Sequence, residues 1–254
     1  MKPALGWTQF SREALRKAEA AVLNQEQGVR DEIGFLLLHQ AYSDRFFPGT
    51  SVLQTRLRYI LFVPWMYENI ARQSGKGSID SLLAVEEMRL ISRLKKHYRD
   101  EGGSDDGTGI IGGRSHDQGR LTSQPSSMLY WGALGQWGLL KAGPDGSRPG
   151  RAVVHRALRH RHHAGWVPRD DDGLPVVEEH PFFARLPDPP ADWDKVSTPL
   201  DFSFPADARD EAGFVRRHMA GNCRLDGQQT LLGKLAEVSF DPRTSVSRQL
   251  SCQV

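Results

Sequence analysis

Apolar residues recur at helical spacing through the first hundred residues, and this pattern predicts four helices. The four stripes fall at 11–24, 30–45, 51–70 and 80–99. The fourth is the clearest, because six of its residues are expected on one face of the helix, which is the face to be buried: Leu83, Glu87, Leu90, Ile91, Leu94 and Tyr98. The N-terminal part of the chain is therefore expected to be a helical core.

The ends of the third helix carry local signals. Ser51 and Gln54 have the spacing of a capping box, so the helix is expected to begin at Ser51. Pro64 lacks a backbone N–H and is expected to kink or end the same helix.

Beyond residue 100 the composition changes along the chain. Eight of the fifteen prolines lie between 168 and 205, which indicates an extended connector rather than a packed helix. The sequence predicts a mainly α protein with a small middle module, helical or winged-helix-like, and a Pro-rich C-terminal arm. The expected parts are a helical core (1–100), a flexible Gly/Asp-rich loop (101–119), the middle module with a basic Arg/His segment (120–167), a Pro-rich acidic connector (168–206), short helices (207–236) and a disordered tail (237–254).

Composition narrows the class of protein. Hydrophobic residues make up 39% of the 254 residues, which is enough for a folded core. The longest nearly apolar stretch runs over nine residues, Tyr59 to Tyr67, against the ~20 that span a bilayer. Cys223 and Cys252 are too few for a disulfide framework or a four-cysteine zinc site. We therefore expect a cytoplasmic protein with no membrane partner.

Charge is distributed unevenly. Residues 1–169 carry a net charge of +8 and residues 170–254 one of −6. The segment 148–169 contains four histidines, no acid and six arginines, which are the candidate nucleic-acid-binding residues: Arg148, Arg151, Arg156, Arg159, Arg161 and Arg169. Guanidinium groups pair with phosphates and release counterions, so this segment is expected to attract polyanions. In the alternative, Asp170–Asp172 neutralise it within the folded protein.

Two further sites have a phosphate-binding and a structural interpretation. Ser126 and Ser127, near Tyr130, stand at an expected helix start, where backbone and hydroxyl groups can bind phosphates. In the alternative, this segment is structural and its aromatic residues belong to the hydrophobic core. Arg56 and Arg58 lie in an otherwise apolar stretch and form either a phosphate-facing pair or, as we favour, structural ion pairs. The expected partners of these two arginines are the acids of the preceding helix: Asp31, Glu32 and Asp44.

The sequence contains only weak matches to metal-binding and nucleotide-binding motifs. His160, His162 and His163 near Asp170–Asp172 have suitable ligand types for a metal, but the neighbouring arginines would repel a cation. Gly107–Gly112 matches a dinucleotide fingerprint by letter only, because a helix rather than a strand is expected before it. We therefore expect the protein to bind no metal, cofactor or nucleotide. We favour a non-enzymatic protein over an enzyme.

Several strings together resemble a known family. FPGTS (47–51) and QTRLRYILFVPW (54–65) are the specific ones; Gly6–Trp7, Arg30–Asp31–Glu32, Pro125–Ser126–Ser127, Tyr130–Trp131 and Trp137–Gly138 support them. Over roughly residues 5–220 the chain resembles a large uncharacterised bacterial family, a domain of unknown function. The resemblance implies a setting beside helicase-type and phospholipase D-like proteins in prokaryotic defence or mobile gene clusters, and implies no catalytic residue.

Three functions remain open. The first hypothesis is a non-enzymatic nucleic-acid-associated accessory component of a defence or mobile-element system, which binds DNA or RNA. The second is a protein-interaction scaffold for a helicase or for a nuclease such as a phospholipase D-like protein. The third is a metal-dependent hydrolase with an unrecognised site.

Overall fold

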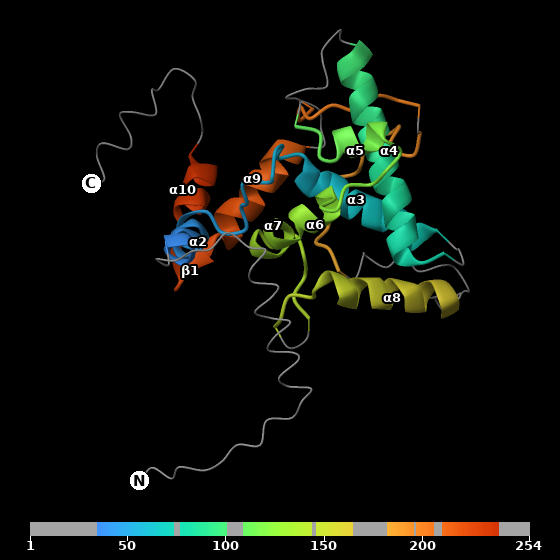
Figure 1. Ribbon diagram of the computed structural model, residues 1–254. Helices are drawn as coiled ribbons and strands as arrows, with labels where there is room; N and C mark the ends of the chain where they lie inside the picture. The colour runs from blue at the N-terminus through green and yellow to red at the C-terminus, as the bar shows by residue number, and fades with distance from the viewer. Residues whose placement is uncertain are drawn as a thin grey trace, which may run out of the picture. The chain divides into compact units, whose positions relative to one another are not determined.

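The computed structural model describes residues 35–73, 77–100, 109–143, 146–164, 182–195, 197–205 and 210–238. It is mainly helical, which confirms the expected class (Figure 1). The chain divides into two compact units after Tyr42; the structure described below is that of the second unit. The elements are α2 (Phe35–Phe46), α3 (Tyr59–Arg72), α4 (Ile79–Asp100), α5 (Gly113–Asp117), α6 (Ser126–Leu129), α7 (Trp131–Gln136), α8 (Arg151–Ala164), α9 (Glu211–Asn222), β1 (Arg224–Leu225), β2 (Gln228–Gln229) and α10 (Leu231–Glu237).

Helix α3 is the centre of the second unit. Every residue from Tyr59 to Tyr67 is buried, so this part of the helix packs against the core on all sides. It begins at Tyr59, not at Ser51, although the capping contacts do form: the Ser51 N–H donates to Gln54 Oε1 (3.3 Å), within a turn that precedes the helix. Pro64 lies inside the helix and does not end it, because packing on all sides compensates for one lost backbone hydrogen bond.

Helix α4 packs against α3 and matches its predicted bounds within one residue at each end. Leu83, Leu90 and Leu94 are buried as the pattern required. Among the described residues, no helix has both the length and the apolar character needed to cross a membrane.

The described part of the Pro-rich connector, 182–195 and 197–205, packs into the core; we call this segment the strap. Phe183, Trp193 and Leu200 are buried in the same cluster as α3. The indole N–H of Trp65 donates to the carbonyl of Pro187 (3.0 Å). An extended arm was expected here; proline content excludes helix but does not determine whether the intervening apolar residues are buried.

The segment expected to be a flexible loop, 101–119, is ordered where the structure describes it. Gly112 has a positive φ of 78° and leads into α5. The N–H of Ile111 donates to the Tyr59 hydroxyl (3.0 Å), and Lys95 on α4 pairs with Asp117 (2.7 Å). These contacts hold α5 to α3 and α4.

The middle module is the helical one of the two forms expected. Its described residues form α6, α7 and α8, with a single isolated bridge between Leu140 and Phe183 in place of a wing. Trp131 and Trp137 each donate an indole N–H to a carbonyl, of Pro149 and Pro48 respectively, so these aromatics belong to the packing.

The last described segment contains a hairpin between two capped helices. Asp210 accepts from the Gly213 N–H (3.1 Å) at the start of α9, and Thr230 caps α10. Between them β1 and β2 pair antiparallel around Asp226 and Gly227, which have φ values of 51° and 77°. Such a two-residue Asp-Gly turn is a strong hairpin signal, and the sequence analysis missed it.

Candidate nucleic-acid interface

Helix α8 separates apolar and basic residues onto opposite faces. Val154 and Leu158, four apart, are fully buried against the core. Arg156, Arg159 and His160 are exposed on the other side. Residues three and four apart on a helix are neighbours, so these three side chains form one surface, which we call the α8 basic face. No acid occurs between residues 148 and 164.

The other arginines of the segment have different surroundings. Arg148 is exposed just before the helix, whereas Arg151 is partly buried beside Tyr67. Arg161 is also partly buried, with an interaction of its own in the structure. Arg169 lies outside the described residues. The six arginines therefore do not form a single uniform patch.

His155 belongs to the interior rather than to the basic face. One ring nitrogen, Nε2, lies 2.8 Å from the Tyr67 hydroxyl, and the other, Nδ1, lies 3.0 Å from Asp80 Oδ1. Burial lowers the pKa of His155, and the nearby Asp80 carboxylate opposes that shift. Burial also raises the pKa of Tyr67 to about 12, so its hydroxyl remains protonated at neutral pH. This Asp–His–Tyr chain ties α8 to α3 and α4.

Acidification is expected to destabilise the fold through His155. A buried histidine with a lowered pKa binds fewer protons folded than unfolded, so stability rises with pH across this range. The contribution is lost as the pH falls below about 6.5, the ordinary histidine value. Urea midpoints measured at about pH 7.5 and 5.5 should differ less in His155→Gln than in wild type. His160→Gln, on the exposed side of the same helix, is the control, and an unchanged pH dependence in His155→Gln contradicts the assignment.

Arg58 lies in a buried ion-pair cluster with partners from distant parts of the chain. Its Nε and Nη2 donate to the two carboxylate oxygens of Glu211 (2.8 and 2.9 Å), and its Nη1 donates to Asp201 (2.9 Å). Arg58 is 4% exposed and Glu211 fully buried. The cluster joins α3, the strap and α9, and the groups involved are structural.

Of the acids expected to pair with Arg56 and Arg58, Asp31 and Glu32 lie outside the described residues, and Asp44 is exposed. Arg56 is exposed, with its guanidinium 5.8 Å from the centre of the Phe202 ring. Proximity in sequence was a poor guide, because Glu211 is 153 positions from Arg58.

Ser126 and Ser127 are buried and bonded within the protein, so they are not accessible to a phosphate. Both are fully buried, where the Ser126 hydroxyl and the Ser127 N–H donate to the two carboxylate oxygens of Glu87 (2.8 and 2.7 Å). Burial raises the pKa of Glu87, and the hydrogen bonds from the two serines oppose that rise. The start of α6 is therefore occupied by a carboxylate from α4.

Sequence reasoning missed a set of buried charges on α4. Glu86, Arg93 and Lys95 are 6%, 4% and 2% exposed. Arg93 donates to carbonyls of the strap, and Glu86 accepts from Arg89 (2.8 Å). The three-residue spacing of Glu86 and Arg89 was a readable signal for that pair, whereas nothing local indicated the partners of Arg93.

Metal and nucleotide sites were not expected. Among the described residues no group of three or more His, Cys, Asp or Glu side chains is placed to hold a metal ion. The side chain of His163 and the residues Asp170–Asp172 are outside the described part. At the described end of the Gly107–Gly112 string, the N–H of Ile111 donates to the Tyr59 hydroxyl.

Comparison with known proteins gives a family and no function. The model of a family of unknown function, DUF6361, matches residues 2–222, which is most of the chain. No curated protein and no solved structure matches the chain.

Proposed function

We propose that this chain, which belongs to the DUF6361 family of unknown function, binds nucleic acid without catalysis through the α8 basic face. The observation that carries the proposal is the exposure of Arg156, Arg159 and His160 on one side of a helix whose other side is anchored in the core. Because the helix is anchored in the core, its backbone needs no ordering when phosphate binds, and only the exposed side chains lose freedom.

The expected binding is weak and tolerant of sequence. Contacts from arginine to phosphate supply affinity without reading bases. The carboxylate of Asp80 pairs with the buried His155 of α8 (3.0 Å). Non-specific binding of this type has a dissociation constant on the order of micromolar to 100 micromolar at physiological salt.

A salt titration tests the proposal. Replacing Arg156 and Arg159 with Gln is expected to weaken binding of every DNA or RNA sequence alike. It should also flatten the slope of log K against log salt by up to about two units, if each residue neutralises one phosphate. Binding of labelled single- and double-stranded probes of both nucleic acids is measured by fluorescence anisotropy at several salt concentrations.

A matched control removes the same charge elsewhere. Arg45 and Lys234 are exposed and line a separate hollow near β2, so Arg45→Gln/Lys234→Gln should leave the salt slope unchanged. Equal losses in the two double variants would mean that only net charge matters, and would contradict a localised interface. A role as an accessory component of a prokaryotic defence or mobile-element system is part of this proposal.

A scaffold function is the second candidate, and exposed apolar side chains favour it. Phe46, Phe47, Val52, Leu53 and Leu57 are all exposed, Val52 to 93%. These residues are close along the chain, and contiguous apolar exposure is typical of protein-binding surfaces. The scaffold hypothesis expects Val52→Ser/Leu53→Ser to abolish salt-insensitive capture of a helicase or phospholipase D-like partner; retained capture would exclude this surface.

A further inference from the structure

A cavity of about 250 Å³ opens between α3, α4 and the strap. At ~30 Å³ per water molecule the space would hold roughly eight waters, so a fitting ligand has on the order of ten non-hydrogen atoms or fewer. Sites for drug-sized ligands are larger, at ~300–1,000 Å³. The cavity therefore has the size for one small molecule rather than for a nucleotide.

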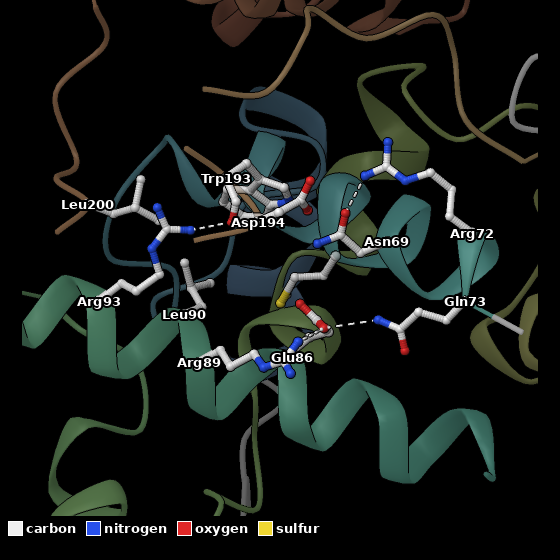
Figure 2. A pocket seen from close by; sticks show the side chains of 11 residues that line it. Asn69, Arg72, Gln73, Glu86, Arg89, Leu90, Arg93, Trp193, Asp194 and Leu200 are labelled. Atoms are coloured by element: carbon white, nitrogen blue, oxygen red, sulfur yellow. Dashed lines mark hydrogen bonds and ion pairs between the residues drawn. The ribbon is translucent and has the colours of Figure 1, made fainter. Parts of the chain in front are cut away.

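One wall of the cavity is apolar. It is formed by three buried side chains, those of Met66, Leu90 and Leu200. Figure 2 shows Leu90 and Leu200 on the side of the cavity opposite Asn69 and Arg72. Apolar surface that leaves water on such a wall stabilises a complex, so the ligand is expected to carry an aliphatic part.

Two carboxylates on the polar side can accept further hydrogen bonds. Arg89 and Gln73 both donate to the Oε1 atom of Glu86 (2.8 and 3.4 Å). The Oε2 atom accepts no hydrogen bond from the described residues and is not sealed from solvent. Asp194 of the strap lies across the cavity from Glu86 (Figure 2), is exposed, and has no hydrogen bond from its side chain to the described residues. A cationic donor fits between these two groups.

Donors lie on the α3 side of the cavity. The side-chain oxygen of Asn69 accepts from Arg72, so the amide nitrogen of Asn69 is left to donate. This nitrogen is accessible, and Figure 2 shows it directed into the cavity. The guanidinium of Arg72 beside it is exposed and has further N–H groups. Amide and guanidinium donors of this kind bind a carboxylate.

The charges around the cavity are nearly balanced. Three arginines and two acids line it: Arg72, Arg89, Arg93, Glu86 and Asp194. A ligand with positive charge alone would be repelled by the arginines, and a ligand with negative charge alone would leave the two carboxylates without a partner. A zwitterion is complementary to both sets of charges.

We propose that this cavity binds a free aliphatic α-amino acid. The ammonium group of the ligand lies between Glu86 and Asp194, and its carboxylate accepts from Asn69 beside Arg72. The aliphatic side chain packs on the apolar wall. The inference is independent of the proposed nucleic-acid binding, because no residue of the α8 basic face lines the cavity.

Isothermal titration calorimetry of the full chain with L-leucine tests the proposal. A dissociation constant on the order of 100 micromolar is expected for a ligand with so few atoms. N-acetyl-L-leucine has no ammonium group and L-leucinamide no carboxylate, so each loses charge-assisted hydrogen bonds and should bind about tenfold more weakly or worse. Glycine, which has no side chain to pack on the wall, should also bind more weakly.

Three ligand results would contradict the proposal. Absence of binding by leucine, valine and methionine overturns it outright. N-acetyl-L-leucine that binds as tightly as leucine overturns the role of the two carboxylates. L-leucinamide that binds as tightly as leucine would mean that the cavity takes the N-terminus of a peptide rather than a free amino acid.

Variants locate the binding in the cavity. Asp194→Asn should weaken leucine binding about tenfold and, because Asp194 is exposed, should leave the fold intact. Asn69→Asp places a negative charge where the ligand carboxylate lies and should abolish binding. Asp192→Asn is the matched control: it removes the same charge from the same segment, but Asp192 does not line the cavity. Unchanged affinity in both cavity variants, or an equal loss in the control, overturns the site.

Discussion

Replacing Arg58 with methionine is expected to lower the free energy of unfolding by about 3–5 kcal/mol, because it removes the cation paired with the buried carboxylate of Glu211. Glu211 is fully buried, and both of its oxygens accept from Arg58. The same change releases Asp201 of the strap. Urea denaturation followed by circular dichroism measures the effect, and Glu211→Gln gives a second estimate should Arg58→Met fail to fold.

An exposed ion pair on α9, the helix that carries Glu211, is the control. Arg217 and Asp210 lie 2.8 Å apart at the start of α9 with side chains that are more than half exposed. Arg217→Met should leave the midpoint close to that of wild type, because solvent screens such pairs. The double variant Arg58→Met/Glu211→Leu should recover part of the lost stability, since an apolar replacement removes both charges. A wild-type midpoint in Arg58→Met would contradict a structural role.

Periodic patterns predicted the parts of the fold in which a helix buries one stripe. Helix α4 repeats its apolar positions over six turns, and its bounds and buried stripe followed from the pattern alone. The first nine residues of α3, Tyr59 to Tyr67, are all buried, so no stripe marked the start of the helix. Leu53 and Leu57 extended the apparent pattern backwards although both are exposed.

Ion-pair partners that are distant in sequence could not be predicted from local patterns. The acids that hold Arg58 come from the strap and α9, and the sequence pointed only to acids close by. The prolines of the strap indicated an extended connector, so the burial of three of its residues was not predicted: Phe183, Trp193 and Leu200. For the proposed site, the absence of acid near Arg156 and Arg159 was readable, but only the packing of Val154 and Leu158 indicated which arginines face outward.

Arg93→Met is expected to detach the strap and to lower the free energy of unfolding by about 3 kcal/mol or more. Arg93 is 4% exposed, and its guanidinium donates to the carbonyls of Asp192, Trp193 and Thr198. Methionine fills much of the same space but donates nothing, so the carbonyls of Trp193 and Thr198 lose this donor, whereas the Asp192 carbonyl still accepts from the Lys195 N–H (2.9 Å). Denaturation and hydrogen exchange of residues 182–205 measure the two effects.

Lys96→Met separates this anchor from a surface contact on the same segment. Lys96 is exposed and donates to the Ser197 carbonyl (2.8 Å), where water replaces it readily. We expect it to leave the stability and the exchange of the strap close to wild type, whereas Arg93→Met speeds exchange throughout the strap. Slow exchange in Arg93→Met would show that burial of Phe183, Trp193 and Leu200 holds the strap without the guanidinium.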